Sequence, residues 1–516
     1  MQGAIAQTSS PSEAAGIHVG AQQMLIDGAW CDASCGGTLP IVNPATEQEI
    51  GTFPDAGADD VERAVWVARA AFAEGSGEWP SKPTAERLEV LGRVLDALAA
   101  DAQRIGAVAS ANGGFTIRSG VGFHAMGAPP FIRQAISQAP AGELAGLPLG
   151  ELPSTSANYL RREPVGVVLA IPPSNAGYFL GLYKVMAALA TGNCVIMKPS
   201  PLEVLSPLEI AKAIAAEPEI PAGVFQLVLG GDEAAAALTA HSGVDKISFT
   251  GSSATASKIM AAAAPNLSRL TFELGGKSPV IVCDDADLDI AVDGIVWGFT
   301  NQTGQACTSG TRVLVSDALH DELVERLAAR MERLVVGDPM SPESDIGPVI
   351  TAAHRDRIEG FVADAVAAGA KLVTGGQRPD VKPGFYVVPT LLDEVTNDME
   401  VAREEIFGPV VAVIRYSDLD DAVVIANDST YGLAATVWSR DLPTALGLAK
   451  RLRAGTVWVN EHHVVSPIAP FGGYKRSGFG REFGVDGLLE FTEVKHVHVD
   501  LTQRGQRPLH GIVLGH

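Results

Sequence analysis

The sequence predicts an α/β fold with two domains. At 516 residues the chain exceeds the size that one hydrophobic core usually serves, so two or three domains are expected. Its composition, with 47% apolar and 19% charged residues, is that of an ordinary globular protein. Short β-rich runs alternate with helical stretches through much of the chain, which is the pattern of mostly parallel sheets covered by helices on both faces.

The first alternating series lies in the middle of the chain. Its β-rich runs are 166–171, 194–197, 224–229, 246–249 and 280–282, and its helical stretches include 207–216 and 287–297. Repeated βαβ units of this kind favour a dinucleotide-type domain. A second series indicates another α/β domain, with a strand at 312–315, a helix at 321–334 and a strand at 456–459.

Three segments lie outside these series. Residues 1–20 are small and polar without apolar periodicity, so we expect a loose terminal arm. From Leu88 onward, Leu91, Leu95 and Leu98 recur at helical spacing and predict an amphipathic helix. The stretch 139–153 is rich in Gly and Pro, which indicates a connector or the approach to a hairpin.

Charge and cysteine content exclude several classes of function. The 38 Lys and Arg against 60 Asp and Glu give a net charge of -22, which disfavours a nucleic-acid partner. An anionic cofactor would therefore need a local device, such as a helix N-terminus or a single Lys. Among five cysteines only Cys31 and Cys35 are close, and no Cys or His cluster accompanies them, so we expect neither a disulfide framework nor a metal site.

The sequence also bears on location. The first Lys or Arg is Arg63, so the positive region of a secretory signal is missing, and no apolar run approaches the roughly 18 residues of a membrane span. We therefore expect a cytoplasmic protein without a membrane partner.

Two segments carry groups suited to covalent catalysis. Residues 273–279 read Glu-Leu-Gly-Gly-Lys-Ser-Pro, which places a carboxylate before two glycines that allow close approach of the backbone. Residues 304–307 read Gly-Gln-Ala-Cys and place a thiol after another glycine. In order and spacing these segments resemble the general-base and nucleophile motifs of the aldehyde dehydrogenase superfamily, of the hydrolytic, non-acylating type.

Further segments resemble that family in its order, over roughly residues 25–497. They are 43–46 (Asn-Pro-Ala-Thr), 173–175 (Pro-Ser-Asn, with Ser where the family has Trp), 198–200 (Lys-Pro-Ser), 249–252 (Phe-Thr-Gly-Ser), 404–409 (Glu-Glu-Ile-Phe-Gly-Pro) and 470–475 (Pro-Phe-Gly-Gly-Tyr-Lys). A chance concurrence of so many ordered motifs is hard to credit.

The resemblance implies two Rossmann-like α/β domains and a small β oligomerisation element. The cofactor-binding domain would comprise 21–144 and 164–274, and the catalytic domain 275–476. The oligomerisation element and C-terminal tail would comprise 145–163 and 477–516. A homodimer or homotetramer is implied, with the hairpin near 145–163 and the strand near 491–500 as pairing surfaces.

The resemblance assigns four catalytic residues. Cys307 would add to an aldehyde, form a thiohemiacetal and then a thioester, although an isolated cysteine is more often a small buried hydrophobe. Glu273 would be the general base, against the ordinary alternative of a solvated surface acid. Family members that pass the acyl group to coenzyme A generally lack this Glu, so hydrolysis is favoured. Asn175, otherwise a common turn residue, would donate to the oxyanion, and Lys184, otherwise a solvated lysine, could support Asn175 by hydrogen bonding.

The resemblance also implies a nicotinamide cofactor. Gly251 and Ser252 would hold the diphosphate at a helix start, in place of the familiar Gly-x-Gly-x-x-Gly. The remaining cofactor positions are Lys198 on the adenine ribose, Glu405 on the nicotinamide ribose, Phe407 near the nicotinamide, and Leu274.

Two departures from the family pattern affect the cofactor prediction. Ala256 replaces a glycine of the family, which alters local packing. Pro201 stands where many members have a Glu that accepts from the 2′-hydroxyl. NAD is expected, and NADP stays open.

The substrate pocket is carried over position by position. It would be lined by Ala176, Leu180, Tyr183, Asn301, Ala306, Thr308, His463, Val465 and Phe471, with core packing as the alternative for each. Ala176 and Val465 are small where familiar acetaldehyde-type members have aromatic residues, which indicates a roomier tunnel. No Arg or Lys falls at these positions to clamp a distal carboxylate. A medium or bulky, largely apolar aldehyde is therefore expected, with a semialdehyde as the alternative within the family.

Two other hypotheses compete with an aldehyde dehydrogenase. A cysteine hydrolase could use Glu273, Lys277 and Cys307 as a Glu-Lys-Cys constellation. A non-catalytic descendant of the fold is the other, and it is disfavoured because Cys307, Glu273 and Asn175 occur together.

Overall fold

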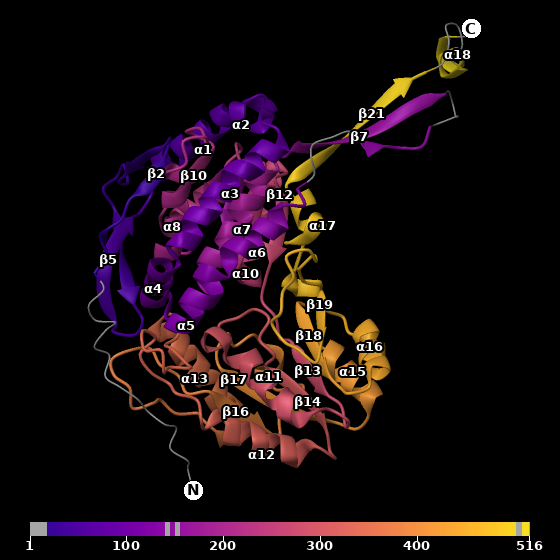
Figure 1. Ribbon diagram of the computed structural model, residues 1–516. Helices are drawn as coiled ribbons and strands as arrows, with labels where there is room; N and C mark the ends of the chain where they lie inside the picture. Colours follow the sequence, from indigo (N-terminus) through magenta and orange to yellow (C-terminus); the bar gives the residue numbers. More distant parts are fainter. Residues whose placement is uncertain (1–17, 140–144, 150–154, 502–507, 515–516) are drawn as a thin grey trace.

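The protein is built around two large β-sheets (Figure 1). A computed structural model describes residues 18–139, 145–149, 155–501 and 508–514. Most of the loose arm expected at 1–20 lies outside the described residues. Within them, no helix combines the length and the apolar character that crossing a bilayer requires.

The first sheet has eight strands and the order β20-β12-β11-β8-β9-β10-β2-β3. Their bounds are β2 (Met24–Ile26), β3 (Ala29–Cys31), β8 (Val167–Ile171), β9 (Cys194–Met197), β10 (Phe225–Leu227), β11 (Lys246–Thr250), β12 (Arg269–Glu273) and β20 (Gly478–Phe479). The five strands from β12 to β10 are parallel, and antiparallel strands flank them at both edges. Residues of β8, β9 and β11 are buried throughout, as expected for parallel strands covered on both faces.

Helices cover both faces of this sheet. One layer consists of α3 (Thr84–Ala100), α6 (Ala128–Ile136), α7 (Gly177–Ala190) and α8 (Leu205–Ala215). The other consists of α1 (Ala58–Phe72), α9 (Asp232–Ala240) and α10 (Ser253–Ala263). The amphipathic helix predicted from its leucines is confirmed as α3, which buries Leu91, Leu95 and Leu98.

The second sheet has seven strands and the order β15-β16-β17-β14-β13-β18-β19. Their bounds are β13 (Pro279–Val282), β14 (Arg312–Ser316), β15 (Lys371–Thr374), β16 (Thr390–Asp393), β17 (Val410–Tyr416), β18 (Ala434–Trp438) and β19 (Thr456–Val459). On one face pack α11 (Leu288–Thr300) and α12 (His320–Met331), and on the other α15 (Leu419–Asn427) and α16 (Leu442–Arg451). The helix α13 (Ala352–Ala367) lies beside this sheet (Figure 1).

One strand was grouped wrongly by sequence reasoning. The run 280–282 was grouped with the first series by its position in the chain, although the domain division implied by the resemblance placed it in the catalytic domain; β13 pairs with β14 and β18 in the middle of the second sheet. A strand joins the sheet whose strands it pairs with through hydrogen bonds, and this strand pairs with strands that come later in the chain. The chain thus crosses from one sheet to the other between Glu273 and Pro279.

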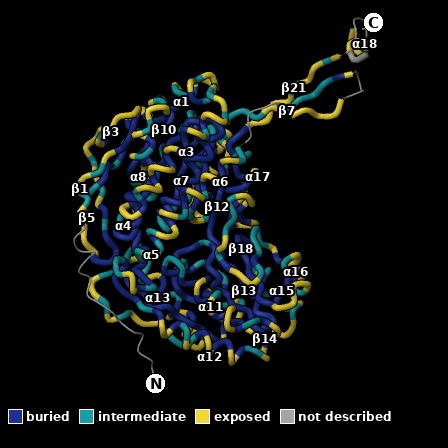
Figure 2. Tube along the Cα trace, in the orientation of Figure 1, coloured by how far each residue is buried: buried dark blue, intermediate teal, exposed yellow. Residues whose placement is uncertain are grey.

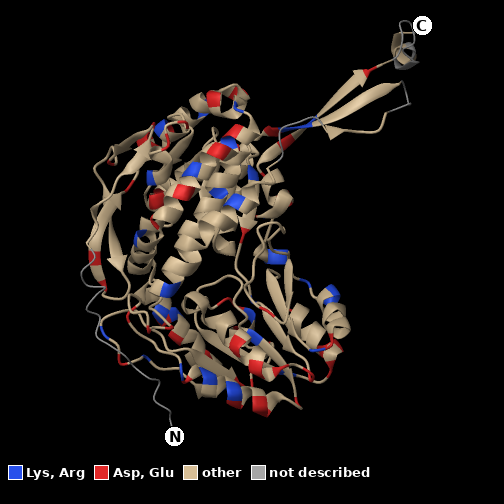
Figure 3. Ribbon diagram, in the orientation of Figure 1, with Lys and Arg blue, Asp and Glu red and all other residues tan. Residues whose placement is uncertain are grey.

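A narrow arm projects from the body of the molecule (Figure 1). It consists of β6 (Ala145–Gly146), β7 (Ser156–Pro164) and β21 (Thr492–Asp500), in the order β21-β7-β6, and it ends near α18 (Pro508–Leu514). Residues of this arm are largely exposed or half-buried, in contrast to both large sheets (Figure 2). A fourth, three-stranded sheet of β1 (Gly20–Ala21), β4 (Thr38–Asn43) and β5 (Gln48–Pro54) lies at the edge of the first domain. Charges of both signs are interspersed over the outer helices (Figure 3).

Candidate active site

Cys307 lies in a tightly held loop between α11 and β14. The residues before it, 302–304, all have left-handed backbone, with φ of 53°, 59° and 73°. For a residue other than glycine this conformation costs about 1–2 kcal/mol, so neighbouring groups must stabilise the loop. Thr303 donates its hydroxyl to the Gly347 carbonyl at 3.1 Å, and the Gln305 side chain accepts from the Ile350 amide at 3.0 Å.

The Cys307 thiol is half-buried at the edge of the first domain's core, which Leu180 and Val465 also contact. Burial and, to a smaller extent, the carboxylates of Glu405 and Glu273 together raise the pKa of the Cys307 thiol to about 12. The thiol therefore carries its proton at neutral pH, and a base is needed before it can act as a nucleophile.

Glu273 ends β12 and buries its carboxyl group. Neither of its oxygens has a hydrogen-bond partner among the residues that the structure describes. Burial and the charge of Glu482 hold the pKa of Glu273 well above its usual range, while Lys184 and Arg481 act in the opposite direction. A buried carboxyl group with free oxygens is able to hold and release a proton inside the protein.

The glycines after Glu273 bring its segment against two others. The Gly276 amide donates to the Glu405 carboxylate at 3.1 Å. A Cβ at Gly275 would lie 2.0 Å from the Glu405 Oε2, and one at Gly276 would lie 2.5 Å from the Cys307 carbonyl oxygen. Only glycine permits such approaches, so the Gly-Gly pair joins the base segment to both the thiol loop and the Glu405 loop.

Asn175 lies in the turn between β8 and α7, and its side-chain amide donates to the Gln305 carbonyl at 2.7 Å. This bond places the amide on the thiol loop, two residues before Cys307. Because an amide carries two N–H donors, the second is able to serve an oxyanion formed at Cys307.

The expected support of Asn175 by Lys184 is wrong. Lys184 is buried on α7, where its ammonium donates to the Ser248 hydroxyl at 3.1 Å and pairs with the Glu482 carboxylate. Lys184 is two turns beyond Asn175 and points toward β11, which carries Ser248. Its pairing with Glu482 instead places a charged pair beside Glu273.

The predicted cofactor residues offer polar groups of the right kind. Lys198 is buried after β9, and in the described part of the chain no protein group pairs with its ammonium. Burial lowers the pKa of Lys198 to about 8, although Asp232 and Asp55 oppose this shift. Burial raises the pKa of Glu405 to about 7. Both groups gain from a ligand that replaces lost hydration, such as the ribose hydroxyls of a dinucleotide.

The loop of Glu405 and Phe407 is fixed by α13. Arg357 donates to the carbonyls of Ile406 and Glu405 at 2.7 and 2.6 Å, and His354 bonds to the Phe407 carbonyl at 2.7 Å. These three bonds hold the backbone of the loop, and its Glu405 side chain meets the segment at Gly276.

The predicted diphosphate site begins α10. Ser252 is its N-cap, and its hydroxyl oxygen accepts from the Thr255 amide at 3.1 Å. The start of this helix suits an anion because its first N–H groups lack helical partners. Ala256 is buried in the core, so the methyl group that replaces the family's glycine is accommodated there. Leu274 is also buried, and its amide donates to the Ser477 carbonyl at 3.0 Å.

The predicted pocket residues are mostly buried or half-buried, and Tyr183, His463 and Thr308 form side-chain hydrogen bonds. Tyr183 is 0% exposed, and its hydroxyl accepts from the Phe483 amide at 2.7 Å. The His463 Nδ1 bonds to the Thr308 hydroxyl at 2.8 Å, which joins two of the predicted lining residues to each other. The remaining positions are buried or half-buried side chains, namely Ala176, Leu180, Asn301, Ala306, Val465 and Phe471.

Sequence reasoning missed an aromatic cluster beside these residues. Phe179 stacks on Phe123 with ring centroids 5.4 Å apart, and Phe131 lies 5.1 Å from both Phe179 and Phe483. Phe123 lies in the π-helical segment Gly120–Met126 and is 43% exposed. No motif marked these rings, because they come from separate helices and resemble core residues in the sequence. The cluster gives this side of the site an apolar wall.

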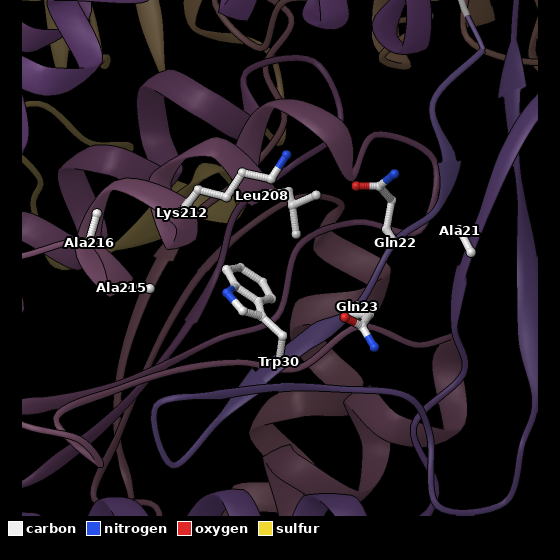
Figure 4. Close-up of a pocket in the computed structure, with 8 residues that line it drawn as sticks. All are labelled: Ala21, Gln22, Gln23, Trp30, Leu208, Lys212, Ala215 and Ala216. Atoms are coloured by element: carbon white, nitrogen blue, oxygen red, sulfur yellow. The ribbon is translucent and has the colours of Figure 1, made fainter.

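A separate surface pocket lies at the far edge of the first sheet (Figure 4). It has a volume of about 410 Å³ and is lined by Ala21, Gln22, Gln23, Trp30, Leu208, Lys212, Ala215 and Ala216. Trp30 belongs to β3, at the opposite end of the sheet from β12 and Glu273. This pocket contains none of the predicted site residues.

Comparisons with known proteins agree with the site's chemistry. Residues 30–497 match the sequence model of the aldehyde dehydrogenase family. The chain is 38% identical to betaine aldehyde dehydrogenase of Bacillus subtilis over 486 residues, covering 92% of this chain and 97% of that one. A crystal structure of NAD-dependent aldehyde dehydrogenase from Sinorhizobium meliloti superimposes with a TM-score of 0.91 at 38% identity, covering 96% and 98% of the two chains. Betaine aldehyde dehydrogenase from Staphylococcus aureus in complex with NAD+ gives a TM-score of 0.89 at 33% identity, covering 94% and 96%.

Proposed function

Because this chain belongs to the aldehyde dehydrogenase family and is an NAD-dependent oxidoreductase acting on aldehydes, we propose that it oxidises a medium or bulky, largely apolar aldehyde to the carboxylic acid through Cys307. One observation carries the proposal: the buried carboxyl of Glu273 and the amide of Asn175 are both joined to the loop of Cys307, one through Gly276 and the other through Gln305.

The chemistry begins with transfer of the thiol proton. Glu273, once ionised, accepts the proton of Cys307 directly or through a water, and the sulfur adds to the aldehyde carbon. Asn175 and the Cys307 backbone N–H donate to the oxyanion of the thiohemiacetal, and such a donor is often worth about 3 kcal/mol of barrier. NAD, when bound, supplies the acceptor for the hydride that leaves this carbon.

Water completes the reaction. Glu273 first releases the proton it took from the thiol to solvent, and then takes a proton from the water that attacks the thioester carbon, which releases the acid together with the Cys307 thiolate. The free oxygens of Glu273 suit this role because they are buried without competing partners in the described residues. Hydrolysis is therefore favoured over transfer to coenzyme A.

Lys198 and Glu405 would hold the two riboses of NAD, and the start of α10 at Gly251 and Ser252 would hold its diphosphate. NADP is the alternative, because Pro201 supplies no carboxylate to repel a 2′-phosphate. Replacing Pro201→Glu should raise the preference for NAD over NADP, as measured by the ratio of kcat/KM for the two cofactors. An unchanged ratio would mean that this position does not set the preference.

The substrate proposal rests on the apolar surroundings of Cys307. Leu180 and Val465 contact the same core as the thiol, and the aromatic cluster at Phe123 and Phe179 lies beside them. A bulky apolar tail gains from burial here at roughly 25 cal/mol per Å². A semialdehyde would need a cation for its distal carboxylate, and none of the predicted lining positions supplies one.

A cysteine hydrolase is not supported by the geometry. The Lys277 ammonium is buried, and neither it nor the Glu273 carboxyl has a hydrogen-bond partner in the described ranges. A Glu-Lys-Cys relay needs Lys277 bonded between the other two groups, and that arrangement is not formed.

We also propose that the chain assembles as a homodimer or homotetramer through the projecting arm. The outer edge of β21 has no strand partner among the described residues, so its backbone groups are able to pair with a second copy. Light scattering, which gives the molar mass in solution, would test this assembly on the full chain and on the Val497→Pro variant.

An aldehyde panel tests the reaction and the substrate together. Formation of reduced nicotinamide is measured with octanal, benzaldehyde and succinic semialdehyde, each with NAD and with NADP. We expect the two apolar aldehydes to have the higher kcat/KM, and Cys307→Ser to abolish turnover. The highest kcat/KM for succinic semialdehyde would overturn the substrate proposal, and full activity of Cys307→Ser would overturn the mechanism.

A further inference from the structure

Two adjacent histidines pack against the residue that follows the catalytic cysteine. His462 is buried and His463 half-buried, in the segment after β19. The Thr308 carbonyl bonds to the His462 Nε2 at 3.1 Å. The Thr308 hydroxyl bonds to the His463 Nδ1 at 2.8 Å. The carbonyl and the hydroxyl of Thr308 are thus held by neighbouring imidazoles.

The bonds define the proton positions on both rings. A carbonyl oxygen only accepts, so His462 donates from Nε2 to Thr308, and His463 donates from Nε2 to the Gly298 carbonyl at 3.0 Å. Each Nδ1 then accepts from a hydroxyl, that of Thr436 at 2.7 Å for His462 and that of Thr308 for His463. Burial lowers the pKa of both imidazoles, that of His462 to about 4, which agrees with two neutral rings.

The local packing leaves the His462 ring little room to move. A Cβ at Gly298 would lie 2.9 Å from the His462 Cδ2, and one at Gly310 would lie 2.9 Å from its Cε1. Gly298 and Gly310 flank the thiol loop, and the Gly310 amide donates to the Gly298 carbonyl at 3.1 Å. The ring therefore fills a space between the end of α11 and the start of β14.

We infer that His462 and His463 are positioning residues for Cys307 that act through Thr308. Asn175 holds the loop at Gln305, two residues before the thiol, and the two histidines hold it at Thr308, one residue after. Cys307 lies between these fixed points, so its backbone N–H and its sulfur keep one orientation toward a bound aldehyde. This inference rests on the proposed use of Cys307 as the nucleophile.

The same contacts connect the thiol to the substrate side of the site. Val464 and Val465 directly follow the histidines, and Val465 packs against the same hydrophobic core as Cys307. Trp297, one residue before the Gly298 that accepts from His463, meets the His463 ring edge to face at 5.7 Å. The segment of Val464 and Val465 and the loop of Cys307 are consequently connected through the rings of His462 and His463.

Asparagine and glutamine substitutions test this role atom by atom. An Asn side chain carries its amide near the place of Nδ1, and a Gln side chain carries it near Nε2. His463 contacts Thr308 through Nδ1, so His463→Asn should retain the contact and His463→Gln should lose it. His462 contacts Thr308 through Nε2, so the order should be reversed, with His462→Gln retaining the contact and His462→Asn losing it.

We expect the two contact-losing variants to lower kcat about tenfold, the effect of one lost neutral hydrogen bond. The contact-retaining variants should recover most of that loss, and KM for benzaldehyde and NAD should stay within about twofold throughout. Thr308→Val should lower kcat by the same factor as His463→Gln, whereas Thr308→Ser keeps the hydroxyl and should retain kcat. The double variant His463→Gln with Thr308→Val should have a kcat no lower than that of either single variant, because both remove the same contact. The crossed order is not expected of residues that only stabilise the fold, and melting temperatures identify any variant that fails to fold.

Alkylation of Cys307 by iodoacetamide, followed by mass spectrometry, reads the same contacts without turnover. We expect the contact-losing variants and Thr308→Val to react at least threefold faster than wild type. Equal kcat for Asn and Gln at each histidine, full kcat in Thr308→Val, an unchanged alkylation rate, or a loss confined to KM for the aldehyde would each overturn the inference. Absence of turnover in the wild-type enzyme would contradict the proposed function instead, and the alkylation rates would still decide the positioning role.

Discussion

The substitution Glu273→Gln tests whether Glu273 is the base that removes the proton from the Cys307 thiol. The substitution keeps the size of the side chain and removes its ability to accept a proton. The pKa of the Cys307 thiol is raised to about 12 by burial and by the carboxylates of Glu405 and Glu273. At pH 7 this leaves a thiolate fraction of about 10⁻⁵, since each pH unit below the pKa is a factor of ten.

The size of the effect follows from that fraction. A positioned general base contributes about 10²–10⁴ in rate, so Glu273→Gln should lower kcat/KM at pH 7 by that factor. Without the base, the rate should follow the thiolate fraction and rise about tenfold per pH unit, or about a thousandfold from pH 7 to pH 10. The sign is fixed by charge: a negative Glu273 raises the pKa of the thiol, so at pH 10 the variant's Cys307 should ionise more readily than that of the wild type.

Two measurements decide the outcome. Steady-state formation of reduced nicotinamide gives kcat/KM from pH 7 to pH 10, and iodoacetamide alkylation of the cofactor-free enzyme gives the thiolate fraction at Cys307. Glu89→Gln, at an exposed position on α3, is the matched control and should change neither. A Glu273→Gln enzyme within threefold of wild type at pH 7, or an alkylation rate that is flat from pH 7 to pH 10, would refute the reasoning.

Three further substitutions probe the contacts described above. Asn175→Ala should lower kcat by about 10²–10³ with little change in melting temperature, and an unchanged kcat would remove Asn175 from the oxyanion site. Gly275→Ala places a Cβ 2.0 Å from the Glu405 Oε2, so KM for NAD should rise at least about tenfold, and a normal KM would contradict the cofactor role of that loop. Lys184→Met leaves the Glu482 carboxylate buried without its cation and should lower the free energy of unfolding in urea by about 3–5 kcal/mol, with partial recovery on adding Glu482→Gln. Equal stability of the Lys184 variant and wild type would show that the pair is not needed for folding.

Local sequence patterns predicted the elements but not all of their partners. The leucines of α3 and the buried strand β8 were recognised because the 3.6-residue spacing and the continuous apolar run are local signals. The strand at 280–282 was assigned to the wrong series, because the choice between two sheets depends on pairing with β14 and β18, which follow later in the chain.

The candidate site divides in the same way. Glu273 and Cys307 were found because each lies in a motif with adjacent glycines. Glu482 was missed, since a buried Glu that pairs with a Lys 298 positions away resembles a surface acid in the sequence. The bonds of the His463 ring nitrogens to Thr308 and Gly298 had no signal in the sequence, because only the folded chain brings these groups together.

The segment 274–278 is the shortest path between the two large sheets, and it has a role in geometry as well as in connectivity. It leaves the last residue of β12, which is the base, and enters β13 after passing beneath the thiol loop. The position of Glu273 relative to the loop of Cys307 therefore depends on the length and backbone of this segment. The projecting arm is not part of this connection, whereas the five-residue spacer is. A change in the length of the spacer would therefore move Glu273 relative to the thiol loop and impair the proposed proton transfer from Cys307.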